Sequence, residues 1–347
     1  MSARHGNRRS TAAAIALTAA VTAGAATLLT GCGPAATRVV GAGAPAGSAS
    51  AAVGGAGSSS SSAPSPSSAP TKTRARVLNG TASNRLTISN GTSKVVMNGT
   101  VVDFGIVVRD IAWNPNGTRA AFIDGNGNLE VSDPDGSGRV LVARAPSGET
   151  WSHPTWQVVK ADKQYGIPAG SFLYFAAAKG GVQHVDSVSL ATGHAAPAAI
   201  TVGGGVDTPA LPQAGYTWPS GDGDGHSITF ANSGDGEVYV RDDYLRTQSG
   251  KVTNGSEPAI SPDARSVVFV RSVGGHDHLF VEQLQEQNAT ARDLTPDATT
   301  DYTEPTWSPD GRTIAARVTD GVATLPADGS SAPTRVSSYT GLPVYRG

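Results

Sequence analysis

The chain has 347 residues, with 26 Lys or Arg against 28 Asp or Glu, and a formal net charge of −2 at pH 7. No basic block runs along it, which excludes a protein that neutralises nucleic-acid phosphates with a cationic stripe. The single cysteine, Cys32, excludes intramolecular disulfides and metal sites that need two cysteines.

The first 31 residues have the features of a secretory signal. Arg4, Arg8 and Arg9 give a positive start, and residues 11–29 form a run of Ala, Leu, Val and small residues. This run is too weakly apolar for a membrane span. The Arg8–Arg9 pair raises the twin-arginine route, but the hydrophobic residues expected just after it are absent. We therefore expect export as an unfolded chain.

The signal ends in Leu-Thr-Gly-Cys at residues 29–32, which resembles the lipobox of bacterial lipoproteins. The resemblance implies cleavage between Gly31 and Cys32 and lipid, diacylglycerol and palmitate, on the Cys32 thiol. The protein would then be extracytoplasmic and lipid-anchored to the cell membrane. The alternative is an ordinary signal peptide with a cysteine at this place by chance.

Residues 32–72 predict a tether. They are almost wholly Ala, Gly, Ser, Pro and Thr, with too little apolar bulk to offset conformational entropy, so we expect disorder. A segment of this length spans on the order of 35 Å as a random coil. Without the three signal arginines the net charge is −5. Residues 73–347 then form one globular head, expected to be monomeric.

The head repeats itself. The anchor residues of the repeat are Trp113, Trp156, Trp218, Ile260 and Trp307, 43, 62, 42 and 47 residues apart. Such periods are typical of propeller blades. Each anchor is followed by a turn rich in Pro, Asp and Gly and then by short β-branched and aromatic runs, which predicts an all-β fold of four-stranded antiparallel blades.

Residues 304–311, which read Glu-Pro-Thr-Trp-Ser-Pro-Asp-Gly, carry a family resemblance. This stretch and residues 257–263 are similar to the WD40-like repeat of TolB-type β-propellers. The resemblance implies six blades. We expect the sixth to have Val344 as its anchor and to take its outer strands from residues 74–78, 85–88 and 94–97. Both ends of the head would then share one blade and close the ring.

The side chains that suggest a site also have plainer interpretations. We expect the anchor tryptophans to pack between blades, whereas Trp151, outside the anchor position, is the better surface candidate. Asp-rich loops at residues 124–128 and 222–225 resemble calcium loops, but hairpin turns explain them. His276 and His278 fall in a predicted inter-strand loop without a third ligand. His153 falls near a propeller face. We predict no catalytic residue, no metal and no cofactor.

Three functions stay open. The first is a non-catalytic protein-binding or scaffolding module of the cell envelope. The second is a binder of a small molecule or glycan at the propeller axis, and the third is a hydrolase or lyase with an axial active site. No Gly-x-Ser-x-Gly motif is present. The N-terminal α/β domain of TolB has no counterpart in the sequence, so TolB's partners are not carried over.

Overall fold

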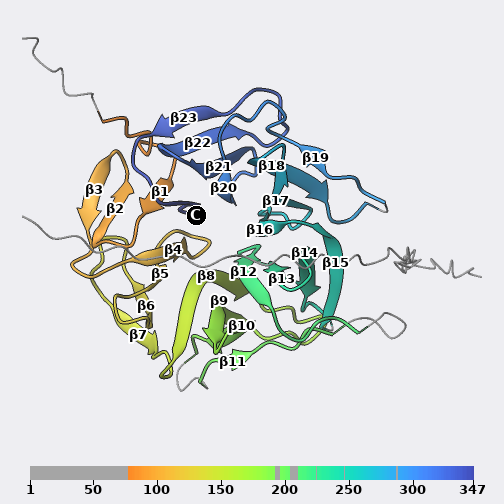
Figure 1. Ribbon diagram of the computed structural model, residues 1–347. Helices are drawn as coiled ribbons and strands as arrows, with labels where there is room; N and C mark the ends of the chain where they lie inside the picture. The colour runs from red at the N-terminus through yellow and green to blue at the C-terminus, as the bar shows by residue number, and fades with distance from the viewer. Residues whose placement is uncertain (1–76, 192–195, 204–209, 224, 246, 287) are drawn as a thin grey trace, which may run out of the picture. The chain divides into compact units, whose positions relative to one another are not determined.

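The computed structural model describes residues 77–347, except 192–195, 204–209, 224, 246 and 287. The signal, Gly31, Cys32 and the tether predicted at residues 32–72 all lie outside the described residues. The described strands form six four-stranded antiparallel sheets arranged as blades around a central axis (Figure 1). The described part of the chain contains no helix that is long and apolar enough to cross a membrane.

The first three blades contain the residues from β1 to β11 and the last strand, β24. Blade 1 is built of β24 (Leu342–Tyr345), β1 (Leu86–Ser89), β2 (Lys94–Met97) and β3 (Thr100–Asp103). Blade 2 is built of β4 (Arg109–Trp113), β5 (Ala120–Ile123), β6 (Leu129–Ser132) and β7 (Val140–Ala143). Blade 3 is built of β8 (Glu149–Val159), β9 (Gly170–Lys179), β10 (Val182–Ser189) and β11 (Ala198–Ala199). Each blade is given from its innermost to its outermost strand.

The other three blades each use four consecutive strands. Blade 4 is built of β12 (Tyr216–Gly221), β13 (Ser227–Asn232), β14 (Glu237–Asp242) and β15 (Gln248–Asn254). Blade 5 is built of β16 (Ser256–Ile260), β17 (Ser266–Val273), β18 (His276–Gln283) and β19 (Arg292–Asp293). Blade 6 is built of β20 (Thr303–Trp307), β21 (Thr313–Val318), β22 (Gly321–Pro326) and β23 (Thr334–Ser337).

Blade 1 closes the ring, because its innermost strand β24 comes from the end of the chain and its other three from the start of the head. Leu86 of β1 pairs with Tyr345 of β24. The predicted closure is therefore confirmed. The outer strand of this blade is not the one expected at residues 74–78, of which 74–76 lie outside the described residues. The outer strand is β3, whereas Leu78 accepts a backbone hydrogen bond from Ser338 beside blade 6.

The turn after the anchor explains why Ser-Pro-Asp-Gly recurs. Ser308 Oγ accepts the Thr313 N–H at 2.9 Å and donates to Asp310 Oδ1 at 2.6 Å, so one hydroxyl holds both ends of the turn between the first two strands. Where the sequence has Asn114 instead of serine, its Oδ1 accepts the Arg119 N–H at 3.0 Å. An acceptor side chain after the anchor is therefore what this turn requires.

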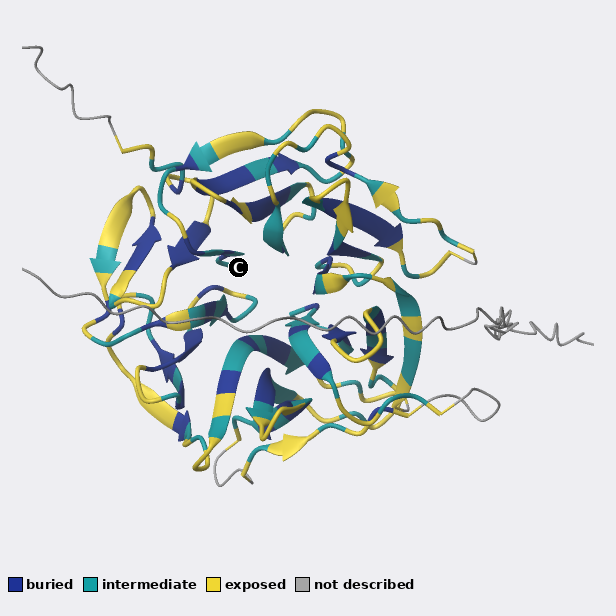
Figure 2. Cartoon of the chain, in the orientation of Figure 1, coloured by how far each residue is buried: buried dark blue, intermediate teal, exposed yellow. Residues whose placement is uncertain are grey.

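The hydrophobic core is divided among the junctions between blades. Each of the six buried clusters joins side chains of two consecutive blades, as Leu86 and Tyr345 of blade 1 do with Ala315 and Val322 of blade 6. Figure 2 shows buried residues mainly along the inner and middle strands and exposed residues mainly along the outer strands and loops. A single blade therefore buries its faces only against its neighbours.

Indole N–H groups add polar links between blades. Trp113 Nε1 donates to Thr87 Oγ1 in blade 1 at 3.0 Å. Trp156 and Trp307 donate in the same way to the backbone carbonyls of Ala112 and Ala259, at 3.1 and 2.9 Å. Each of these rings thus fills a junction and places its N–H on the preceding blade.

Candidate functional site

The innermost strands bend toward the axis at the same point in five blades. At this point one residue has a φ of 50–53° and the pairing with the second strand shifts register, which is the geometry of a β-bulge. The five residues are Asp110, His153, Trp218, Glu257 and Glu304. Non-glycine residues rarely adopt this conformation, so its recurrence shows that the fold imposes it.

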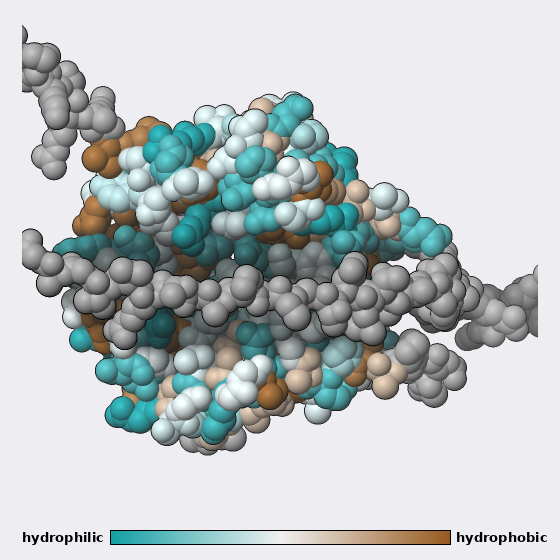
Figure 3. Space-filling view, in the orientation of Figure 1, coloured by the Kyte–Doolittle hydropathy of each residue, from teal (hydrophilic) through white to brown (hydrophobic). Residues whose placement is uncertain are grey.

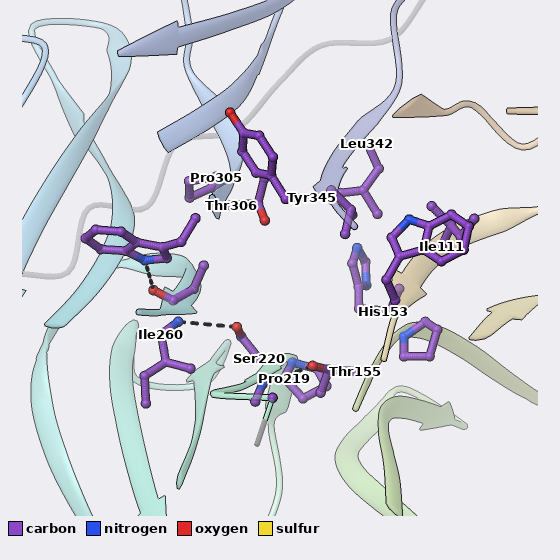
Figure 4. Close-up of a pocket in the computed structure, with 18 of the residues that line it drawn as sticks. Ile111, His153, Thr155, Pro219, Ser220, Ile260, Pro305, Thr306, Leu342 and Tyr345 are labelled. Carbon is purple, nitrogen blue, oxygen red and sulfur yellow. Dashed lines mark hydrogen bonds between the residues drawn. The ribbon is translucent and has the colours of Figure 1, made fainter. Parts of the chain in front are cut away.

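A cavity of about 380 Å³ lies on the axis, and all five bulge residues line it together with Leu342 of β24. In five blades the residue after this cavity-lining residue is a proline, whereas Asp110 is followed by Ile111. The prolines are Pro154, Pro219, Pro258, Pro305 and Pro343. Proline is tolerated there because an edge strand facing a cavity needs no further ladder hydrogen bond on that side. Figure 4 shows side chains of the cavity wall surrounding a central space.

Carboxylates tie neighbouring bulges together. Asp110 Oδ2 accepts the backbone N–H of His153 at 3.1 Å, and Glu257 Oε2 accepts that of Glu304 at 2.6 Å. Glu304 Oε1 in turn accepts a hydrogen bond from Arg317 Nη1 at 2.9 Å. Each of these bonds fixes a charged side chain at the axis with a defined direction.

An aromatic pair forms another part of the wall. The ring centroids of His153 and Trp218 are 3.6 Å apart, with an angle of 41° between the ring planes. Burial lowers the pKa of His153, although the Asp110 carboxylate opposes this effect. His153 is therefore neutral at pH 7 and supplies aromatic surface rather than positive charge.

The two glutamates have raised pKa values. Burial raises the pKa of Glu257 to about 7; the Glu304 N–H lowers it, while the Glu304 and Asp277 carboxylates raise it further. Burial also raises the pKa of Glu304, against the effect of Arg317. Raised carboxyl pKa values in a cavity are a frequent property of functional sites.

Glu257→Gln should stabilise the fold at high pH only. The folded pKa of about 7 exceeds the ordinary value of 4.5, so the unfolded chain releases the proton first and stability falls as the pH rises between these values. Glutamine cannot ionise, so we expect the melting temperature of the variant to exceed the wild-type value by at least about 6 °C more at pH 8 than at pH 4.5. Thermal melts at both pH values, with exposed Glu286→Gln as the control, check this; an equal difference at both would contradict it.

The structure changes two of the predicted anchors. After Trp113, Ile260 and Trp307, the next backbone N–H donates to a carbonyl at the start of the second strand. The N–H groups of Asp222 and Arg346 donate in the same way, so Gly221 and Tyr345 take the anchor places in blades 4 and 1. Trp218 lies three residues before Gly221, at the bulge, and Val344 lies one residue before Tyr345. The predicted register of blade 4 is wrong because the Trp-Pro-Ser-Gly stretch at residues 218–221 resembles the Trp-Ser-Pro motif but begins three residues before the anchor place.

Trp151 is not a surface residue, and that prediction is wrong. It is 3% exposed, packs on Phe175 with ring centroids 4.7 Å apart, and donates from Nε1 to Glu149 Oε1 at 2.6 Å. The cause is the length of β8, which continues beyond the bulge and carries Trp151 into the junction between blades 2 and 3.

Of the other predicted site residues, Asp222 lines the axial cavity, whereas Asp124, His276 and His278 lie away from it. Asp124 Oδ1 accepts the N–H groups of Asn126 and Asn128 at 2.8 Å, so its carboxylate stabilises a hairpin turn. His276 and His278 belong to strand β18 and not to a loop, because Gly274 and Gly275 alone make the turn. Their Nδ1 atoms face different carboxylates, those of Asp301 and Asp293.

Sequence reasoning missed three of the five bulge residues, Asp110, Glu257 and Glu304; it named Trp218 as an anchor and His153 without a role. A signal for them exists, because residues 153, 218, 257 and 304 each immediately precede a proline in an innermost strand. In these blades, the residue three positions before the anchor is variable and is followed by a proline. This pattern marks the side chain that lines the axial cavity.

These features define a six-bladed β-propeller with an axial cavity to which all six blades contribute side chains. No protein-family model matches the sequence, and no curated protein matches it either. Among solved structures, a protein assigned as TolB in Agrobacterium tumefaciens is similar, with a TM-score of 0.52 and 17% identity over 74% of this chain and 89% of that one. The chain therefore has a TolB-like propeller fold.

Two enzymes with solved structures resemble the chain more weakly. An oligogalacturonate lyase in complex with manganese has a TM-score of 0.43 and 12% identity, over 71% of this chain and 70% of that one. A puromycin-hydrolysing peptidase from Mycobacterium tuberculosis has the same TM-score and identity, over 76% of this chain and 46% of that one.

Proposed function

We propose that this protein is a lipid-anchored, extracytoplasmic binding module of the cell envelope, without catalytic activity, that holds a segment of a partner protein at the axis of its propeller. The observation that supports this function is the axial cavity, lined by side chains from all six blades. A volume of about 380 Å³ is within the range of pockets that take a drug-sized ligand or a few side chains.

The polarity of the face that Figure 3 draws supports a local binding site. Figure 3 shows that hydrophilic and weakly polar side chains make up most of the visible face, with small groups of hydrophobic ones between them. Large apolar patches are typical of extensive docking surfaces, whereas a polar face with a cavity suits capture of a short segment. The prolines of the wall add rigidity, which lowers the entropic cost of binding.

A photoreactive phenylalanine derivative in place of Trp218 tests this function in cells. Trp218 is half-buried in the cavity wall, so a bound protein segment would lie within reach of the probe. We expect a light-dependent adduct of one defined protein. The same probe at Val140, 54% exposed on the outer strand of blade 2, is the control and should give no such adduct. Equal adducts at both positions, or none at Trp218, would contradict the proposal.

Cys32→Ala should move the protein out of the membrane fraction. Each buried methylene of an attached acyl chain contributes about 0.8 kcal/mol to membrane binding, so loss of the lipid removes the anchor. Cell fractionation with immunoblotting measures the distribution, and mass spectrometry of the wild-type protein identifies the N-terminal residue and its mass. A variant that stays in the membrane fraction, or a wild-type chain without lipid at Cys32, would count against anchoring.

A further inference from the structure

The axial cavity is acidic. Asp110, Glu257 and Glu304 line it, and a second cavity of about 370 Å³ shares the two glutamates and adds Asp301. Among the described residues that line the two cavities, Arg317 is the one side chain with a permanent positive charge. The cavities therefore have an excess of negative charge, which favours a cationic ligand.

One carboxylate oxygen at this place lacks a donor. Glu304 has a side chain that is 14% exposed, and its Oε1 accepts a hydrogen bond from Arg317. Its Oε2 is buried and has no hydrogen-bond partner among the described residues. A buried carboxylate oxygen without a donor is unfavourable, so the site favours a ligand that brings an N–H group.

The arrangement suits an organic cation better than a metal ion. A metal needs several ligands that converge to within about 2.0–2.6 Å of one point. Among the described residues, no three His, Cys, Asp or Glu side chains are grouped closely enough to hold one. The carboxylates lie around a wide cavity beside the rings of His153 and Trp218, and aromatic rings add attraction for a diffuse cation.

We infer that the partner segment inserts an arginine side chain into the axial cavity, with its guanidinium group against Glu257 and Glu304. This inference rests on the proposed function and names the chemistry of the bound segment. Guanidinium carries five N–H donors in a planar fork, which can reach two carboxylates at once. Its aliphatic stem would lie along Pro258 and Pro305, which line the same cavity.

Titration of the purified full-length protein with N-acetyl-arginine amide tests the inference, with saturation-transfer NMR as the readout. The neutral isostere N-acetyl-citrulline amide is the ligand control. We expect the arginine compound to bind at least tenfold more tightly than the citrulline compound. We expect a loss of at least tenfold in Glu304→Gln and in Glu257→Gln, whereas Asp320→Asn, which removes an exposed charge outside the cavity, should leave the affinity unchanged.

The outcomes separate this inference from the proposed function. Equal binding of the two compounds overturns the arginine inference. The absence of binding of either compound at about 10 mM also overturns it. The photo-adduct at Trp218 would still support a protein-binding site in that case. Binding of CaCl₂ that the arginine compound cannot displace also overturns it. Melting temperatures of the glutamine variants show whether a loss of binding comes from loss of the fold.

Discussion

Deletion of residues 342–347 is expected to lower the melting temperature by more than about 10 °C. The deletion removes β24, which pairs with β1 over four residues, and it takes Tyr345 out of the junction between blades 1 and 6. Truncating one large buried aromatic side chain alone costs about 3–5 kcal/mol. In a domain of this size, 1 kcal/mol corresponds to about 2–4 °C. Differential scanning calorimetry measures the change.

Deletion of Gly347 alone is the matched control for the loss of β24. Gly347 lies beyond the strand, so its removal leaves the pairing of Leu86 with Tyr345 intact, and we expect a change of less than about 2 °C. If the deletion of residues 342–347 also changes the melting temperature by less than about 3 °C, the ring does not depend on β24 for its closure.

Trp113→Ala is expected to destabilise the protein by about 3–5 kcal/mol, or roughly 8–15 °C in melting temperature. The indole is 7% exposed, fills the junction between blades 1 and 2, donates to Thr87 Oγ1, and lies under the guanidinium of Arg346 at 5.1 Å. Trp113→Phe keeps most of the volume and loses the N–H, so it should cost about 1–2 kcal/mol.

Trp218→Ala is the control that separates the two kinds of tryptophan. Trp218 is half-buried at the axis and contacts the His153 ring, so its truncation should cost less than half as much as Trp113→Ala. Denaturant unfolding of the three variants measures the free energies. Equal losses in Trp113→Ala and Trp218→Ala would mean that Trp218 packs as an anchor, in contradiction to the register of β12.

The sequence was sufficient for the fold because each blade is specified locally. The turn residues and the short β-branched strands all lie within one repeat, so the blade type followed from them, whereas the sixth blade and the ring closure followed from the resemblance to TolB-type propellers. Blade 3 shows where this reasoning ended. Its first two strands have 11 and 10 residues, and the longer pairing that buries Trp151 depends on blade 2.

The axial site could not be predicted in the same way, because it combines residues from all the repeats, which are distant in the sequence. Glu257 and Glu304 share the backbone conformation of the other bulge residues. Their raised pKa values, however, come mainly from burial in the cavity wall, where blades 5 and 6 meet. Trp218 was placed in the wrong register, because its positive φ, the register shift of β12 and the bond between Asp222 and Ser227 appear only in the folded strand.

The bulges separate the evolution of binding from the evolution of stability. The conformation at Asp110, His153, Trp218, Glu257 and Glu304 is set by the strand, and these five positions hold four residue types that differ in size, charge and shape. Mutations at these positions can therefore change what the ring recognises while the junctions that hold it together stay as they are. Propellers of this type can diverge rapidly in ligand choice, and an engineer can vary the axis position by position on a constant scaffold.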